Sequence, residues 1–189
     1  YYPRIAAAAE QKDTKAFYLA LREYVFNIPD GYIRINTPED YREEAIGGGY
    51  GFSILPLDDG RLIACNLEKD GFAENSGIRW GAEIIEWNGM PAREALQKTS
   101  VLWCENPPAT DEYTLFEKCM MMTRAPVGTE VAVLFRNPGQ ENTWGTRLRA
   151  STSQPGPAAL GTRRRASPCT PRGTPRPCLA TTSFSWHPL

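Results

Sequence analysis

The composition of this chain changes abruptly at residue 151, and this break limits how much of the chain can fold. All 22 Asp and Glu residues lie before it with 16 of the 21 Lys and Arg residues, so residues 1–150 carry a formal charge of −6. Residues 151–189 contain five Arg residues, no Lys, no acid and seven of the 16 Pro residues, for a charge of +5. A segment of this kind buries too little apolar surface to offset the entropy of ordering it. We therefore predict a folded part up to residue 150 and a disordered Arg/Pro-rich tail over 151–189.

Composition also excludes several classes of function. The folded part is acidic and lacks the excess of positive charge that binds nucleic acid, so no nucleic-acid partner is expected. No run approaches 18 apolar residues, so no membrane span is expected. The five Cys residues show neither CxxC nor metal-ligand spacing, and the single His is His187. We therefore expect no metal site, no cofactor, and buried free thiols in place of a disulfide framework.

The N-terminal part, residues 1–45, has a helical pattern. Apolar residues recur at spacings of three to four from Phe17 to Val25, which predicts one helix over residues 6–26. Residues 29–31 (Pro-Asp-Gly) end it, and the alternation in 32–35 is typical of a short strand. Thr37 then suits an N-cap, with Pro38 in the first position of a helical turn.

Residues 46–150 combine strand and helix patterns, which predicts an α+β domain. Strands are expected at 53–57, 61–67, 82–87 and 130–136, with residues 143–148 pairing back as a further strand. Asn88-Gly89 between apolar runs is a strong hairpin signal. Short helices are expected at 72–77 and 91–102, and a longer one at 111–124 with Thr110 as its N-cap.

A glycine-rich segment, Gly47-Gly48-Gly49-Tyr50-Gly51-Phe52, leads directly into the first strand of this domain. Glycine permits positive φ angles, and successive N–H groups in such a turn can converge on a carboxylate. An alternative remains open, in which the glycines form only a flexible hinge. Phe52 belongs to the core under both interpretations.

The order of these elements resembles a PDZ domain over residues 47–137. Residues 49–52 (Gly-Tyr-Gly-Phe) resemble its carboxylate-binding loop, and 71–78 (Gly-Phe-Ala-Glu-Asn-Ser-Gly-Ile) resemble the segment after its next strand. Residues 81–91 match the family stretch Gly-Asp-x-Ile-x-x-Val-Asn-Gly-x-Pro, with Ala82 and Glu83 in place of the usual Asp region. The resemblance implies a partly open β-barrel with flanking helices. It also implies that an unstructured polypeptide C-terminus adds as an extra strand beside residues 53–55.

The resemblance further implies a set of peptide-binding residues on the loop, the first strand and the facing helix. Pro56 cannot donate a ladder hydrogen bond, so the added strand should be short. Phe116 and Met120 fit the core as well as the groove. The expected peptide-binding residues are Gly49, Tyr50, Gly51, Phe52, Ser53, Ile54, Tyr113, Phe116, Glu117 and Met120.

Over residues 10–150 the chain is similar to the carboxyl-terminal processing serine peptidases, the tail-specific and tricorn-like proteases. The similarity lies in the N-terminal helix, in the long connection between Met90 and Thr110, and in the Thr-Arg-Ala-Pro-Val-Gly-Thr run at 123–129. It implies a role in proteolysis. It also implies an extracytoplasmic location, periplasmic or secreted, as is usual for the family in bacteria.

The chain departs from these peptidases where their α/β catalytic domain should begin, near residue 150. No strand–Ser–helix motif follows, no Lys occurs after Lys118, and no acid occurs after Glu141. Some relatives carry a His after an Asp-Gly pair in the N-terminal part, and here Asp30-Gly31 is followed by Tyr32. We therefore expect no catalytic residues and no peptidase activity from this polypeptide alone.

Alternatives remain open for the domain and for the tail. The domain could be a stand-alone PDZ adaptor, or a structural domain whose groove is filled by its own Phe or Met side chains. The tail contains a PxxP pattern at 168–171, three arginines at 163–165 and a basic kinase-type pattern at 164–167. We favour a different origin for it, the out-of-frame translation of a GC-rich gene, which the other two reading frames of the DNA would test.

Overall fold

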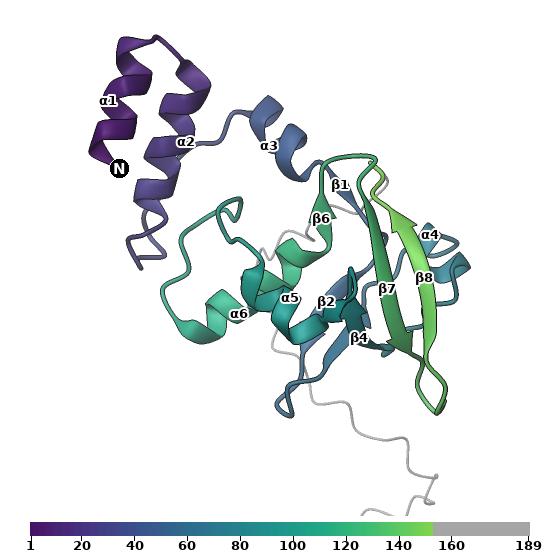
Figure 1. The fold of residues 1–189 in the computed structure, drawn as a ribbon. Helices are drawn as coiled ribbons and strands as arrows, with labels where there is room; N and C mark the ends of the chain where they lie inside the picture. Colours follow the sequence, from purple (N-terminus) through teal and green to yellow (C-terminus); the bar gives the residue numbers. More distant parts are fainter. Residues whose placement is uncertain (153–189) are drawn as a thin grey trace, which may run out of the picture. The chain divides into compact units, whose positions relative to one another are not determined.

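The computed structural model describes residues 1–152, which all belong to the first of the two units into which the chain divides, Tyr1–Gly156. The described residues form an open antiparallel sheet with helices beside it (Figure 1). The prediction of a mixed helix-and-sheet fold with flanking helices is therefore confirmed. The tail predicted to be disordered lies outside the described residues, apart from its first two residues.

The N-terminal part contains two helices, α1 (Tyr2–Glu10) and α2 (Thr14–Val25), which pack against each other (Figure 1). The prediction of a single helix over 6–26 is therefore wrong. The chain turns at Lys12, whose φ of 56° is left-handed. Asp13 then begins α2, because its side chain accepts a hydrogen bond from the Ala16 N–H at 2.9 Å. Asp is one of the preferred N-cap residues, so a local side chain decides where the helix restarts.

The segment between α2 and the sheet also differs from the sequence prediction. Residues 32–35 do not form a strand, and the Ile35 carbonyl accepts a hydrogen bond from Arg22 at 3.5 Å. Helix α3 (Glu39–Ile46) follows, with Pro38 as its N-cap in place of Thr37. The Thr37 hydroxyl accepts from the Arg22 guanidinium at 2.7 Å, so it is used by a tertiary contact.

Arg22 is the largest of the fully buried side chains in the described residues, with 1% of its surface exposed. Its guanidinium donates to neutral oxygens from three parts of the chain: the Leu102 and Cys104 carbonyls at 2.5 and 2.7 Å, the Thr37 hydroxyl at 2.7 Å and the Tyr18 hydroxyl at 3.1 Å. One side chain of α2 therefore joins the N-terminal helices to residues 35–37 and to the loop 99–110.

Two aromatic rings complete the surroundings of Arg22. The Phe26 and Trp103 ring centroids lie 4.5 and 5.4 Å from the guanidinium carbon, within the range of cation–π attraction. Burial lowers the pKa of Arg22, and the positive charge of Arg42 adds to this effect. The guanidinium nevertheless stays charged at neutral pH, because arginine keeps its proton in proteins. The hydrogen bonds to Arg22 are therefore charge-assisted, which makes them stronger than neutral ones.

The main sheet is antiparallel and has the strand order β2-β3-β4-β7-β8, with the short strand β5 paired to β4. Strands β7 and β8 pair from Glu130 opposite Arg149 to Phe135 opposite Trp144. A bulge between Ile84 and Glu86 shifts the register of β4 against β7. The strands are β2 (Ser53–Pro56), β3 (Leu62–Cys65), β4 (Glu83–Trp87), β5 (Met90–Pro91), β7 (Glu130–Arg136) and β8 (Trp144–Arg149).

The turn between β4 and β5 has the geometry that its Asn-Gly sequence predicts. Asn88 and Gly89 have φ angles of 53° and 76°, and a type I′ turn requires both to be positive. The Asn88 N–H donates to the Ala132 carbonyl at 2.8 Å, and the Asn88 side-chain oxygen accepts from the Ala132 N–H at 2.9 Å. Asn88 therefore also fixes the turn against β7.

Three helices flank the sheet: α4 (Phe72–Asn75), α5 (Ala92–Lys98) and α6 (Asp111–Met122). Helices α5 and α6 contact each other, and α6 also contacts β2 (Figure 1). The predicted N-cap of α6 is confirmed, since the Thr110 hydroxyl accepts from the Tyr113 N–H at 3.2 Å. This cap fixes where α6 begins and hence its position beside β2.

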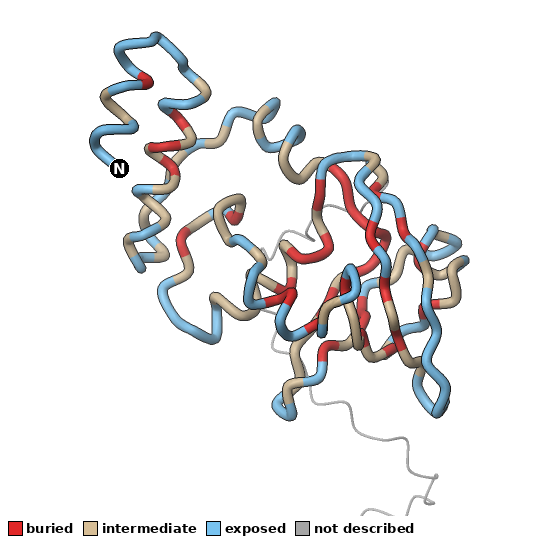
Figure 2. The backbone as a smooth tube through the Cα atoms, in the orientation of Figure 1, coloured by how far each residue is buried: buried red, intermediate tan, exposed pale blue. Residues whose placement is uncertain are grey.

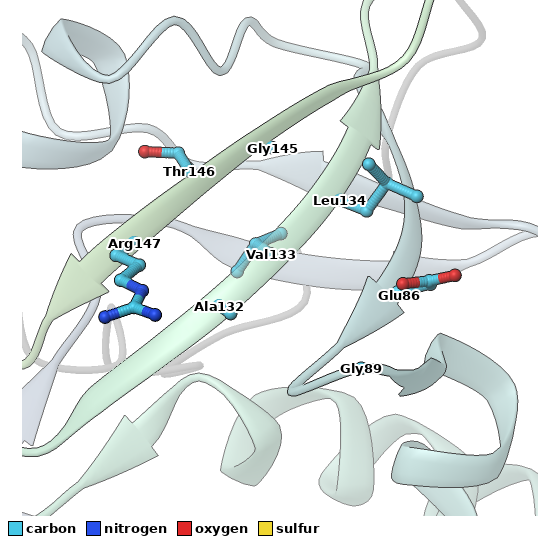
Figure 3. Close-up of a pocket in the computed structure, with 8 residues that line it drawn as sticks. All are labelled: Glu86, Gly89, Ala132, Val133, Leu134, Gly145, Thr146 and Arg147. Atoms are coloured by element: carbon cyan, nitrogen blue, oxygen red, sulfur yellow. The ribbon is translucent and has the colours of Figure 1, made fainter.

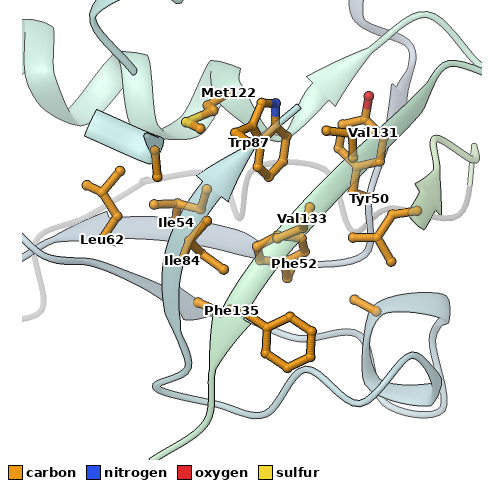
Figure 4. Packing of buried hydrophobic residues seen from close by; sticks show 14 of the residues in the cluster. Tyr50, Phe52, Ile54, Leu62, Ile84, Trp87, Met122, Val131, Val133 and Phe135 are labelled. Carbon is orange, nitrogen blue, oxygen red and sulfur yellow. The ribbon is translucent and has the colours of Figure 1, made fainter. Parts of the chain in front are cut away.

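The hydrophobic core lies between the strands and the inner faces of the helices. Figure 2 shows buried positions along the strands and on the facing turns of α5 and α6, whereas α1 and α3 have few or none. The side chains labelled in Figure 4 come from the glycine segment, from the sheet and from α6. They are Tyr50, Phe52, Ile54, Leu62, Ile84, Trp87, Met122, Val131, Val133 and Phe135.

The three cysteines in the described residues, Cys65, Cys104 and Cys119, are buried free thiols, as predicted. Burial raises the pKa of Cys65 to about 11 and that of Cys119 to about 12, so both stay protonated at neutral pH. Within residues 1–152 no cluster of His, Cys, Asp and Glu side chains could hold a metal ion. No described helix has the length and apolar character needed to cross a membrane.

Candidate functional site

Other parts of the chain hold the glycine segment on both sides. Strand β1 (Gly48–Gly49) pairs with β6 (Arg124–Ala125), so that Gly49 lies opposite Arg124. Gly49 also exchanges two hydrogen bonds with Ser151: its N–H donates at 3.0 Å and its carbonyl accepts at 2.9 Å. A Cβ atom at Gly48 would lie 2.9 Å from the Ala125 carbonyl oxygen, so this close approach requires glycine. The Gly49 N–H is already paired, so a ligand would have to contact the loop after it.

The loop turns at Gly51, whose φ of 81° is left-handed. A Cβ atom there would meet the Ala73 Cβ at 3.6 Å, an ordinary contact, so the backbone conformation is what requires glycine. The Gly51 carbonyl accepts from the Glu68 N–H at 2.9 Å. The segment 49–52 is therefore held by backbone contacts with Glu68, Arg124 and Ser151.

Glu68 places a negative charge beside this loop. Its carboxylate oxygen Oε2 lies 3.8 Å from the position that a Cβ atom on Gly51 would occupy. An anion bound to the loop would be repelled by this carboxylate, by an amount that depends on exposure and salt. Glu68 thus disfavours a bound anion at residues 49–52.

Tyr50 and Phe52 point into the core on either side of Gly51. They are 4% and 0% exposed, and their ring centroids lie 5.6 and 6.3 Å from that of Trp87 (Figure 4). The expectation that Phe52 belongs to the core is confirmed. Because both side chains are buried, these two residues can contact a ligand only through their backbone atoms.

Strand β2 follows the loop and lies at one edge of the main sheet. Its only strand neighbour within the described residues is β3, with Ser53 opposite Cys65 and Ile54 opposite Ala64. Ser53 is half-buried, and Ile54 is 0% exposed and belongs to the core. Helix α6 packs beside this strand. The loop, an edge strand and a helix are therefore adjacent, as the sequence predicts.

Helix α6 presents different stripes of residues to different neighbours. Leu115, Cys119 and Met122 pack into the core. Tyr113 and Glu117, one turn apart, lie on another face. The Glu117 carboxylate hydrogen-bonds the Tyr113 hydroxyl and raises its pKa to about 12.

The second face of α6 points toward the loop 99–110. Burial raises the pKa of the Cys104 thiol, and a hydrogen bond from this thiol to the Glu117 carboxylate raises it further. Phe116 and Met120 are half-buried and one turn apart, and the Phe116 ring stacks on that of Tyr113 with centroids 6.3 Å apart. The four predicted helix residues therefore form two adjacent stripes, of which Phe116 and Met120 are the apolar one.

Sequence reasoning missed two charged residues at this site. Arg124 lies opposite Gly49, and the sequence indicated it only as part of the 123–129 run. Glu68 lies beside Gly51, and no pattern in the sequence pointed to it. Both depend on pairings between residues distant in the chain, so neither spacing nor local composition reveals them.

A separate cavity of about 400 Å³ lies over β4, β7 and β8 (Figure 3). Glu86 of β4 and Arg147 of β8 stand on opposite sides of it, with residues 132–134 of β7 between them. None of the predicted peptide-binding residues lines it. It is therefore a surface distinct from the glycine loop.

Comparisons with known proteins show similarity only to solved structures. No family model matches the chain, and no curated protein matches it. Mature CPAF has a TM-score of 0.49 at 17% identity, over 71% of this chain and 24% of that chain, and its complex with lactacystin has 0.47 at 16% over the same shares. The photosystem II D1 C-terminal processing protease has a TM-score of 0.40 at 18% identity, over 76% of this chain and 34% of that chain. The matched part of this chain thus spans about a quarter to a third of those chains, and its function is inferred below from its own residues.

Proposed function

We propose that residues 46–150 form a PDZ-like domain that binds the C-terminal end of an unstructured polypeptide. The observation that carries this proposal is the sequence of three adjacent features: a shaped glycine loop, an edge strand that begins directly after it, and a helix packed beside that strand. Residues 1–45 are a helical segment that precedes the domain in this proposal.

Each feature has a separate role in binding. The backbone of Tyr50, Gly51 and Phe52 receives the terminal carboxylate, and the hydrogen bonds of the free loop are exchanged on binding. Ser53 and Ile54 pair with the backbone of the peptide, which adds to the sheet as a further strand. Pro56 ends this ladder, because it has no N–H to donate. Phe116 and Met120 supply the apolar wall that contacts the side chains of the peptide.

We further propose that this domain belongs to a serine peptidase of the carboxyl-terminal processing type, in which it would deliver substrate C-termini for proteolysis. The support is the sequence resemblance over residues 10–150. This polypeptide is not expected to hydrolyse the peptide that it binds. A stand-alone adaptor remains the second candidate, and an adjoining reading frame with a Ser/Lys catalytic pattern would distinguish the two.

The loop is tested by exchanging Gly51 for Ala and measuring peptide affinity. Peptides with free and amidated C-termini would be titrated by fluorescence anisotropy, starting from a C-terminal library. Alanine strains the left-handed conformation at 51, so Gly51→Ala should weaken binding at least tenfold, which is about 1.4 kcal/mol. Mass spectrometry of the peptide after incubation should show it intact.

Gly89→Ala is the matched control. Gly89 also has a positive φ, 76°, and a Cβ atom there would have no neighbour within 4 Å, so the two variants carry a similar backbone strain. Gly89 lies in the β4–β5 turn, so Gly89→Ala should change affinity by less than about twofold, equivalent to about 0.4 kcal/mol. Equal binding of free and amidated peptides would contradict C-terminal recognition. Absence of binding across the whole library would favour a purely structural domain.

Glu68 provides a second test of where the carboxylate sits. Replacing it with Gln removes the negative charge beside Gly51 and keeps the size of the side chain. We expect Glu68→Gln to strengthen binding of free-carboxylate peptides by about two- to fivefold at low salt, because two like charges about 4 Å apart in water repel each other by about 1 kcal/mol. Amidated peptides should be unaffected. An unchanged affinity for both peptides would place the carboxylate away from the loop.

A further inference from the structure

Strand β8 forms the edge of the main sheet that lies opposite to β2. Its only strand neighbour in the described part of the chain is β7, with which it pairs along its whole length (Figure 1). Most positions along β8 are exposed (Figure 2). An exposed edge of this kind can pair with a strand from another chain.

The hydrogen bonds just after β8 show which of its residues face the open side. The Ala150 N–H donates to the Thr129 carbonyl at 2.8 Å, on the side of β7. The next residue, Ser151, exchanges hydrogen bonds with Gly49 on the opposite side. Alternate residues of an antiparallel strand bond to the same neighbour, so the directions at 150 and 151 fix those of the whole strand.

Gly145, Arg147 and Arg149 therefore direct their backbone N–H and C=O groups away from β7. Among residues 1–152 these groups form no hydrogen bond, whereas Ser151 uses the same side to bind Gly49. The edge is thus covered at residue 151 and open over residues 145–149.

The side chains of Arg147 and Arg149 stand together on the outer face of the sheet, because Leu148 between them is buried. Arg147 lies opposite Ala132 of β7, and Arg149 lies opposite Glu130. Both arginines are exposed, and neither forms an ion pair with a described residue. The open edge therefore presents two cations at a spacing of two residues.

Gly145 leaves a gap in the same face. A Cβ atom at this position would meet only the Leu134 side chain, at 4.0 Å. The cavity of about 400 Å³ lies here, with Arg147 on the β8 side and Glu86 on the far side (Figure 3). A side chain placed beyond Gly145 has room to reach across it toward Leu134.

We propose that β8 binds an extended acidic segment of another polypeptide, which adds to the sheet as a strand antiparallel to β8. Its carboxylates, two positions apart, lie opposite Arg149 and Arg147, and an apolar side chain two positions further lies over Gly145. Backbone hydrogen bonds supply the affinity of an added strand, and alternate side chains supply its specificity. A second copy of β8 fits less well, because it would bring the arginines of the two copies together.

The probe is the peptide acetyl-Thr-Glu-Thr-Glu-Thr-Val-Thr-amide. It has no terminal carboxylate, so its binding does not depend on C-terminal recognition at β2, the opposite edge of the sheet. NMR titration of the full chain should show saturable shifts of the backbone N–H signals of Gly145, Arg147 and Arg149, with a Kd of about 1 mM. The same peptide with Gln in place of both Glu residues should bind about fivefold more weakly, because two cross-strand charge pairs are lost.

Strand pairing is tested separately from charge. Gly145→Pro removes one outward N–H and keeps both arginines, and proline is tolerated where the N–H of an edge strand faces solvent. It should weaken binding at least fivefold, about 1 kcal/mol, whereas Gly145→Ala keeps the N–H and should change the Kd by less than about twofold. A peptide N-methylated at both Glu residues should not bind, which tests the pairing without altering the protein.

The charges are tested by single substitutions. Arg147→Gln should weaken binding of the Glu peptide about threefold, and Arg149→Gln about twofold, because Glu130 already lies opposite Arg149. Neither variant should change the Kd of the Gln peptide. Arg93→Gln is the matched control, since Arg93 is exposed on α5 and lies beside Gly60, in the turn between β2 and β3. It should leave both Kd values unchanged.

The proposal is overturned if the Glu peptide causes no saturable shift up to about twenty times the expected Kd. It is also overturned if the Gln or the N-methylated peptide binds as well as the Glu peptide. Shifts at residues 145–149 that depend on protein concentration alone would identify a second copy as the occupant. Changes in the signals of residues 153–189 caused by Gly145→Pro without peptide would identify the chain's own C-terminal part. Either result replaces the acidic segment as the partner of β8.

Discussion

Replacing Arg22 with Met should lower the free energy of unfolding by about 3 kcal/mol or more. The substitution removes the donors that serve the Leu102 and Cys104 carbonyls and leaves these groups without their charged partner. An unsatisfied buried acceptor costs about 1–3 kcal/mol. Part of this loss is offset, because the variant no longer pays the cost of removing the Arg22 cation from water on folding. Two carbonyls and two hydroxyls lose a donor together, so the net effect stays large.

Denaturant unfolding followed by circular dichroism would measure the change, and the melting temperature should fall by about 6–12 °C for a domain of this size. Arg34→Met is the matched control, since Arg34 is largely exposed and pairs with the exposed Glu105 at 3.5 Å. A surface ion pair of this kind contributes about 0–1 kcal/mol. A loss below about 1 kcal/mol in Arg22→Met would show that the Arg22 network adds little to stability.

Truncating Phe52 to Ala should lower the free energy of unfolding by about 3–5 kcal/mol. Phe52 is 0% exposed and lies between the glycine loop and the sheet, next to Trp87. Removing its ring loses the burial free energy of the side chain and leaves a cavity that the rigid strands around it fill only in part. Equilibrium unfolding in guanidinium chloride would measure the loss.

Phe72→Ala provides the comparison for Phe52, because the same ring is removed from a side chain that is 54% exposed. It should cost less than about 0.5 kcal/mol. Similar losses in the two variants would mean that the core near the loop repacks without the Phe52 ring. That outcome would contradict its place at the centre of the core.

The sequence predicts the regular elements of the domain well, because period and turn chemistry act locally. The strand 130–136 and the Asn88-Gly89 turn agree with prediction, and so does the N-cap at Thr110. The N-terminal part is where prediction fails. The alanine run at 6–9 and the apolar spacing from Phe17 to Val25 indicate one helix, but Asp13 lies between them and its side chain caps a new helix. Residues 32–35 form no strand despite their alternating pattern, and the Ile35 carbonyl accepts a hydrogen bond from Arg22 instead of a strand partner.

The sequence predicts only part of the candidate site. Contacts between residues close together in the chain are predicted, whereas contacts between residues far apart in the chain are not. The Gly49–Ile54 segment is continuous in the chain, so its residues lie together in any fold. The pairing of Arg124 with Gly49 and the position of Glu68 beside Gly51 come from strand and loop packing. The periodicity of α6 leaves open whether Phe116 and Met120 face the core or the groove. In the structure the loop around Cys104 lies against the Glu117 side of the helix, which the sequence alone does not indicate. A buried arginine such as Arg22 gives no signal at all, because most of its acceptors, carbonyls and hydroxyls alike, lie in distant parts of the chain.

The anchoring of Gly49 has a consequence for how the chain folds. Its two sets of partners, Arg124 and Ser151, come much later in the sequence, so long loops must close before the turn at residues 49–52 is fixed. Closing long loops is entropically costly, and contacts between distant residues slow folding. The segment with the simplest local sequence should therefore be among the last to take its final shape. Synthesis must also pass residue 151 before that shape can be completed.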